Sequence, residues 1–166
     1  WYDGECQRRA SEVEIATQLD IDYLGSNYPF FDTQSIEELK REFGVPPMHV
    51  GSLGVMDGYP QFTEDDHGPM RVWVQLDEEG YAASDRDYIV GCDISQGTGA
   101  SDSALSVVDR LTGEKVAEFC DNRVSVHRFA EIAVAVCRMF AGPGGRGAFL
   151  IWEATGPGRT FGKTVI

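Results

Sequence analysis

Apolar positions in the second half of the chain follow two spacings, one typical of strands and one typical of helices. Residues 88–93 form a short, continuous apolar run, which predicts a central strand buried on both faces. Apolar residues at helical spacing predict a helix over 125–140. Further strands are expected at 104–109, 114–120 and 148–152, with another helix beginning after 155. The order β-β-β-α-β-α predicts an α/β fold, in which three antiparallel strands lead through a crossover helix to a further strand of a mixed sheet.

The first half of the chain has weaker patterns. Helical spacing predicts helices over 9–19 and 33–44, and alternation predicts a half-buried strand over 70–76. The glycines and prolines of 45–68 predict turns, with room for short edge strands. This half is therefore expected to be an irregular helical and β linker region before the sheet.

Charge is distributed unevenly along the chain, whose formal net charge is −13. Residues 1–84 hold five basic and 17 acidic residues, a net charge of −12, whereas residues 85–166 have a net charge of −1. This contrast predicts two units, with a boundary at about 82–85. The chain begins at Trp1 and ends within an apolar pattern at Ile166, so we expect it to be a piece of a longer protein.

Composition and spacing exclude several kinds of site. No apolar run approaches the roughly 20 residues that a membrane span needs. The four cysteines form no C-x-x-C pair, which argues against zinc and against a disulfide framework. The segment GPGRTFGKT at 156–164 lacks the first glycine of a phosphate-binding loop, since Pro157 stands there.

Two lone carboxylates follow apolar strands directly, and they are the strongest candidates for chemistry. Asp93 ends the run 88–93, and Glu153 follows the run 148–152. Acids at neighbouring strand ends repel one another unless a proton or a cation lies between them. Mg²⁺ or Mn²⁺ bound in pairs by carboxylates is a known arrangement for phosphodiester hydrolysis. Asp102, after the glycine turn, is a candidate third ligand.

Simpler interpretations stay open for each of these residues. Asp93 and Glu153 can each merely end a strand and face water, and Asp102 can hydrogen-bond its own turn. Arg159 and Lys163 lie one turn apart on the expected last helix, where they can contact a phosphate backbone or form a solvated basic face.

Several segments together resemble the large terminase subunit of tailed bacteriophages. YIVGCDISQGTGASDSA at 88–104, GEKVAEF at 113–119 and IWEATGPG at 151–158 are similar to the opening of its nuclease domain. Upstream, WY at 1–2, ECQR at 5–8 and IATQLDIDYLGS at 15–26 resemble the end of its packaging ATPase region.

The resemblance implies a ribonuclease H-like fold and a two-metal endonuclease that cuts concatemeric viral DNA during genome packaging in the host cytoplasm. Asp93 and Glu153 match catalytic metal ligands, and Asp102 matches a further acidic position. The resemblance also implies that residues 1–84 close the ATPase region, that 85–166 begin the nuclease, and that the partners are double-stranded DNA, the portal protein and the small terminase subunit.

The family's third essential carboxylate lies beyond Ile166, so we expect the isolated chain to be weakly active or inactive. The family often has asparagine where this chain has Thr155, which weakens a role for an amide there. Two other classes stay open. One is an actin-like or sugar-kinase-like ATPase fragment, and the other is a non-catalytic assembly module.

Overall fold

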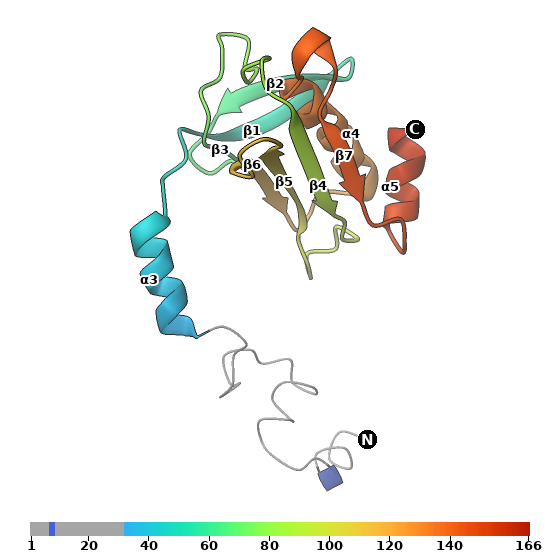
Figure 1. Ribbon diagram of the computed structural model, residues 1–166. Helices are drawn as coiled ribbons and strands as arrows, with labels where there is room; N and C mark the ends of the chain where they lie inside the picture. The colour runs from blue at the N-terminus through green and yellow to red at the C-terminus, as the bar shows by residue number, and fades with distance from the viewer. Residues whose placement is uncertain (1–6, 9–31) are drawn as a thin grey trace. The chain divides into compact units, whose positions relative to one another are not determined.

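The computed structural model describes residues 7–8 and 32–166, and the chain divides into a first unit, Trp1–Val45, and a second unit, Pro46–Ile166 (Figure 1). The helix expected over 9–19 lies outside the described residues. Helix α3 (Thr33–Phe43) confirms the second predicted helix. The Asp32 carboxylate caps it by accepting a hydrogen bond from the Ser35 backbone nitrogen at 2.8 Å, and Gly44 follows its last turn.

The second unit is built on a seven-stranded mixed sheet, which confirms the α/β class and the order β-β-β-α-β-α over residues 88–165. The spatial order of the strands is β2-β1-β3-β6-β5-β4-β7. Within Pro46–Ile166, β4 and β7 pair in parallel and the other neighbours pair antiparallel. The elements are β1 (His49–Met56), β2 (Tyr59–Glu64), β3 (Met70–Val72), β4 (Tyr88–Asp93), β5 (Ser103–Asp109), β6 (Lys115–Asp121), α4 (Val126–Met139), the short 3-10 helix η1 (Pro143–Gly145), β7 (Phe149–Trp152) and α5 (Gly158–Val165).

The division between units lies earlier than the boundary expected at 82–85. Strand β3 pairs with β6, so β1, β2 and β3 extend the same sheet that carries β4 to β7. The change in charge near residue 84 therefore falls inside one compact unit. Charge patterning and backbone pairing are independent, because a ladder of N–H and C=O groups forms whatever the side chains carry.

Strands β1 and β2 form a hairpin longer than the short edge strands expected for 45–68. Asp57 and Gly58 have φ of 52° and 78°, the pair of positive values that a two-residue hairpin turn needs. Gly51 is required by close packing, since a Cβ there would lie 2.3 Å from the carbonyl oxygen of Thr63. Gly51, one of the glycines expected to mark turns, thus lies within β1, where it permits the close approach of the β2 backbone.

Strand β3 ends at Val72, earlier than the expected strand over 70–76. Its neighbour β1 begins at His49, which pairs with Val72. Strand β1 does not extend further toward the N-terminus, because Pro46 and Pro47 precede Met48 and proline has no backbone N–H to donate. In the part of the chain that the structure describes, strand β3 therefore has no strand partner on this side beyond Val72.

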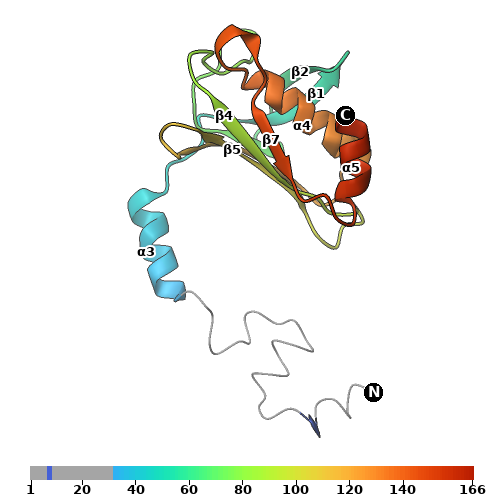
Figure 2. The ribbon, with the colours of Figure 1, turned by 45° about the vertical axis from the view of Figure 1, so that its right-hand side comes forward.

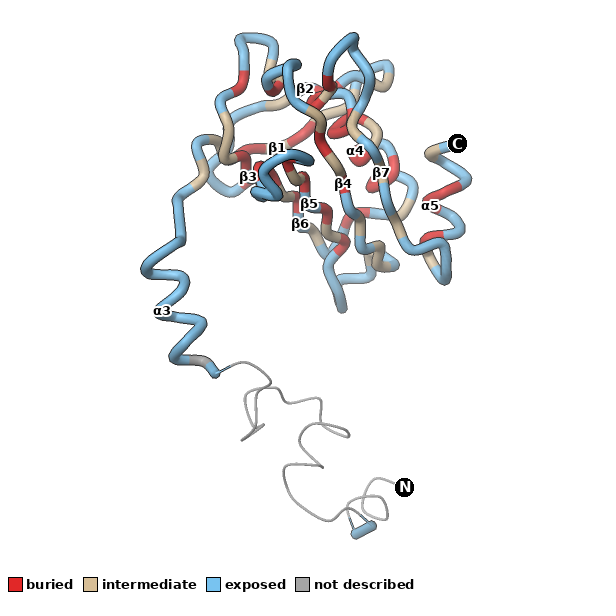
Figure 3. Tube along the Cα trace, in the orientation of Figure 1, coloured by how far each residue is buried: buried red, intermediate tan, exposed pale blue. Residues whose placement is uncertain are grey.

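Helix α4 packs on one face of the sheet, and α5 packs against α4 beside the edge strand β7, as Figures 1 and 2 show. Phe129 of α4 is fully buried, and its ring lies 5.9 Å from that of Phe119 on β6 and 5.7 Å from that of Phe161 on α5. Figure 3 shows the buried residues along α4 and the central strands. Among the described residues, no helix has the length and apolar character to traverse a bilayer.

A buried carboxylate holds the β5–β6 turn at the sheet end where β4 begins. Asp109 is 2% exposed, and the Arg86 guanidinium donates to it at 2.6 Å. The backbone nitrogens of Leu111 and Thr112 donate to its other oxygen at 2.8 and 3.1 Å. The hydrogen bond from Arg86 is the main reason that the pKa of Asp109 lies below its ordinary value of 3.8.

We expect the Asp109→Asn variant to unfold at a lower urea concentration than the wild type at neutral pH. A carboxyl whose pKa is lowered by folding stabilises the fold above its unfolded pKa, and this contribution is lost as pH falls through the folded value. The difference in urea midpoint between the wild type and the variant should therefore become smaller below about pH 3.8. Urea midpoints measured from neutral pH to pH 2 test this, and a constant difference over the whole range would contradict it.

Candidate functional site

The parallel pairing of β4 and β7 places Asp93 and Glu153 at the same end of adjacent strands. The register pairs Cys92 with Trp152, so the next residues along the two strands are Asp93 and Glu153. Neighbouring strands lie about 4.8 Å apart, so the two backbones are adjacent at this point. The prediction that these acids leave neighbouring strands at one sheet end is confirmed.

Alternation along the strands directs both acids toward the sheet face opposite α4. Val90 is fully buried, and Ile94 packs against the core, whereas Gly91 and Asp93 between them are exposed. On β7, Ile151 is 50% exposed, and Glu153 continues the same exposed series. The expectation that 88–93 is buried on both faces was wrong, because α4 packs on the other face of β4 and leaves Gly91 and Asp93 exposed.

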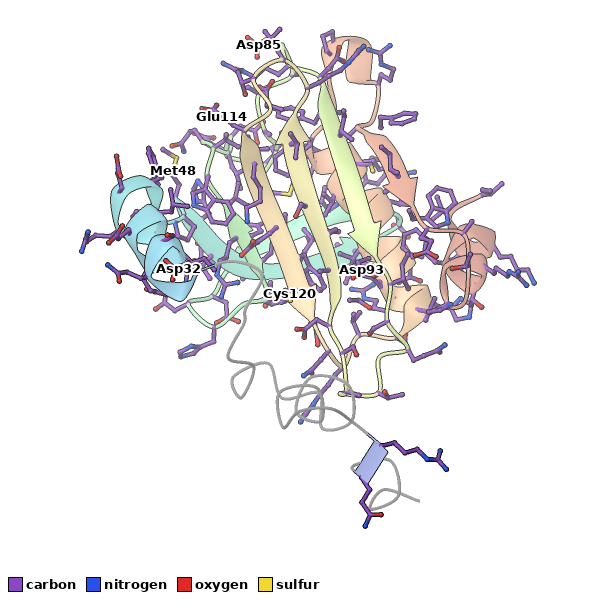
Figure 4. The ribbon with its side chains drawn as sticks, turned by 60° about the horizontal axis from the view of Figure 1, so that its bottom comes forward. Asp32, Met48, Asp85, Asp93, Glu114 and Cys120 are labelled. Atoms are coloured by element: carbon purple, nitrogen blue, oxygen red, sulfur yellow. The ribbon has the colours of Figure 1, made fainter. Side chains whose placement is uncertain are left out.

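A cleft of about 410 Å³ lies beside the end of β4 and brings Asp93 and Asp102 together. In Figure 4, Asp93 and Cys120 lie toward one end of the strands, and Asp85 and Glu114 lie toward the other. The remaining lining is mostly hydroxyl and amide, from Ser95, Gln96, Thr98 and Ser101, together with Ile94 and Pro157.

The loop between β4 and β5 folds back to carry Asp102 toward Asp93. The Ser95 backbone nitrogen donates to the hydroxyl of buried Ser103 at 3.1 Å, which ties the loop's first residues to its end. Gly97 has a φ of 69°, and a Cβ there would lie 2.3 Å from the Val124 carbonyl oxygen, so this position requires glycine. The loop is thereby held against the segment that precedes α4.

The carboxylate of Asp102 also affects a residue of β6. The Cys120 thiol lies near enough for its pKa to be raised, first by partial burial and then by the charge of this carboxylate. A nearby thiol was not anticipated from the sequence. The register that pairs Ala104 with Cys120 was the missing information, since it brings residue 120 beside the residues just before β5.

Glu153 is held in a turn of its own and does not line the cleft of Asp93 and Asp102. The Thr155 hydroxyl donates a hydrogen bond to Glu153 Oε1. A Cβ on Gly158 would lie 1.8 Å from the Glu153 carbonyl oxygen, so the chain can turn into α5 here only with glycine at 158. The structure therefore relates Asp93 to the other two acids in different ways. Asp102 shares a cleft with Asp93, and Glu153 follows the strand that pairs with the strand of Asp93.

Arg159 and Lys163 are exposed on α5, one turn apart as expected, but neither lines the cleft. Pro157, which precedes the helix, does line it. Phe161 anchors α5 on the α4 side of the sheet through Trp152, at a ring distance of 5.7 Å. The start of α5 therefore borders the cleft at Pro157, and neither basic residue is part of the cleft lining.

The donor set fits a hard divalent cation. Carboxylate, hydroxyl and amide oxygens suit Mg²⁺ or Mn²⁺, and Mg²⁺ keeps several of its waters when only one or two carboxylates bind it. Over residues 7–8 and 32–166, no cluster of three or more His, Cys, Asp or Glu side chains is arranged to hold an ion. The described residues thus offer a partial oxygen site at the end of β4, in which water would have to supply most ligands of a bound ion.

No protein-family model matches the chain, and a search of curated proteins finds no match to it. Function is therefore inferred from the site and from the fold that positions it.

Proposed function

We propose that this chain is part of the large subunit of a viral DNA-packaging terminase, with the sheet unit forming the first part of its metal-dependent nuclease domain. The observation that carries the proposal is the parallel pairing of β4 with β7, which places Asp93 and Glu153 side by side at one sheet end. Asp102 adds a second carboxylate to the cleft of Asp93.

The topology supports a ribonuclease H-like identity. An antiparallel series β4-β5-β6 is followed by the crossover helix α4 and by β7, which returns beside β4. This is the β-β-β-α-β core that the family resemblance implies. Strands β1 to β3 extend the sheet on the β6 side, away from the acids.

The proposed roles follow from charge and position. Asp93 and Glu153 would hold one or two Mg²⁺ or Mn²⁺ ions, with Asp102 as a further ligand. The serine and threonine hydroxyls of the cleft would orient water or phosphate oxygens. A bound cation would offset the charge that develops on phosphate during hydrolysis. Arg159 and Lys163 contact the backbone of double-stranded DNA beyond the start of α5. The same proposal includes the portal protein and the small terminase subunit as partners, and it places the protein in the host cytoplasm.

The loop after β4 disfavours the ATPase alternative. A phosphate-gripping turn needs free backbone N–H groups. Here the nitrogens of Ser95 and Gly97 donate to serine hydroxyls within the loop and at its end, and that of Gly99 donates to the Asn122 carbonyl at 2.8 Å. These groups are therefore already engaged within the fold.

Plasmid cleavage tests the proposal. We expect the intact protein that contains this chain to nick and linearise supercoiled plasmid with Mn²⁺, and EDTA to stop it. The 166-residue chain alone should leave plasmid largely intact, because two or three carboxylates hold the ions weakly. An intact protein with no metal-dependent cleavage would favour the assembly-module alternative.

A further inference from the structure

The side chain of Thr155 contacts the proposed metal ligand Glu153. Its hydroxyl donates a hydrogen bond to Oε1 of that carboxylate, from two residues farther along the chain. Both residues are exposed. A hydrogen bond between two exposed side chains contributes little when both move freely, so its value depends on how firmly the backbone holds the pair.

The backbone around this pair is strongly restricted. The Gly158 nitrogen donates to the Thr155 carbonyl oxygen at 2.8 Å, which closes the turn before α5. Gly156 has a φ of 47°, in the region that favours glycine. Gly158 packs against the Glu153 carbonyl, and a Cβ at Gly162 would lie 3.2 Å from the Trp152 ring. The backbone of the turn is thus restricted between β7 and α5, and the hydrogen bond to Glu153 gives the direction of the Thr155 hydroxyl.

A carboxylate with one oxygen engaged in this way presents mainly its other oxygen to a ligand. Mg²⁺ and Mn²⁺ in octahedral sites are commonly bound through one oxygen of each carboxylate, whereas Ca²⁺ takes six to eight ligands and accepts carboxylates through both oxygens. Hydrogen bonds to ligating carboxylates typically change metal affinity by about 10- to 100-fold.

We infer that Thr155 is a positioning residue, which holds Glu153 Oε1 so that only Oε2 would be available to a cation, and which would thereby favour Mg²⁺ or Mn²⁺ over Ca²⁺. The inference depends on the proposed function, because it assumes that Glu153 binds a metal. It gives a role to the hydroxyl at a position where the related family often carries an amide. Both groups can donate to a carboxylate, so the donor matters here rather than the residue type.

The test compares three variants of the 166-residue chain by NMR, with Mn²⁺ or Ca²⁺ as the only added ligand. Thr155→Val keeps the shape and β-branching of threonine but removes the donor, and Thr155→Ser keeps the donor. Thr160→Val makes the same change at an exposed position on α5. Mn²⁺-induced broadening of amide signals gives the Mn²⁺ affinity even when binding is weak, and Ca²⁺ competition gives the second affinity.

We expect Thr155→Val to weaken Mn²⁺ binding about 10-fold and Ca²⁺ binding much less, so that the preference for Mn²⁺ falls. Thr155→Ser should stay close to the wild type, and Thr160→Val should match it. Urea unfolding of all three should be similar, since an exposed hydroxyl contributes little to stability.

The two possible failures can be told apart. If Asp93→Asn abolishes Mn²⁺ broadening in the chain but Thr155→Val leaves both affinities unchanged, the metal site stands and the role of Thr155 is overturned. Equal loss of Mn²⁺ and Ca²⁺ that serine does not restore would also overturn it. If Mn²⁺ causes no broadening that depends on Asp93, the proposed site fails, and the inference fails with it.

Discussion

Asparagine at position 93 is expected to lower metal-dependent plasmid cleavage by the intact protein at least about 100-fold. The substitution keeps the size of the side chain but removes its negative charge, and a neutral amide binds a hard cation far more weakly. Asp93 belongs both to the cleft with Asp102 and to the strand pair with Glu153, so its loss affects every proposed ligand combination. Initial rates of supercoiled plasmid loss with Mn²⁺ measure the effect.

Glu114→Gln is the matched control for this variant. It makes the same change from carboxylate to amide at an exposed residue, and Figure 4 places Glu114 toward the opposite end of the strands. Its cleavage rate should equal that of the wild type. Cleavage that survives in Asp93→Asn would show that the ligands are wrongly assigned, and equal losses in both variants would point to a general charge effect.

Truncation of Phe129 to alanine is expected to destabilise the sheet unit by about 3–5 kcal/mol. Its ring is fully buried between Phe119 of β6 and Phe161 of α5, so its removal leaves a cavity where sheet and helices meet. Urea denaturation followed by tryptophan fluorescence measures the effect, and Trp152, one of the three tryptophans, reports on this region because its ring lies 5.7 Å from that of Phe161.

Phe149→Ala provides the comparison, because the Phe149 side chain is 68% exposed on β7. The same truncation there should change the free energy of unfolding by no more than about 0.5 kcal/mol. Similar losses in the two variants would mean that the exposed face of β7 contributes to stability as much as the core between sheet and helices.

Local patterns in the second half of the chain were sufficient to predict its elements. The apolar run at 88–93 became β4 with the same bounds, and the helical spacing over 125–140 became α4 with Ser125 as its cap. The sequence also allowed the prediction that Asp93 and Glu153 end adjacent strands, since a chain that passes through a crossover helix normally returns as a strand parallel to and beside an earlier one. These features depend on residues close in sequence and on general rules of chain connection.

Other features depended on contacts between distant residues. The pairing of β3 with β6 joined the acidic first part of the sheet to the near-neutral second part, and no charge or apolar pattern encodes such a pairing. Strand β4 was expected to be buried on both faces because its run is continuous. Its outer face is partly exposed because α4 packs on the other one.

The sequence by itself determined which strands and helices form in residues 88–165 and which strand ends carry acids, because periodicity and capping act over a few residues. Only the tertiary structure decided how each acid is held. Asp102 reaches Asp93 because the loop packs on the segment before α4, and Glu153 accepts a hydrogen bond from Thr155 in a turn that requires Gly158. The paths of this loop and this turn follow from close approaches between backbone segments, and such approaches exist only once the sheet and its helices have packed together.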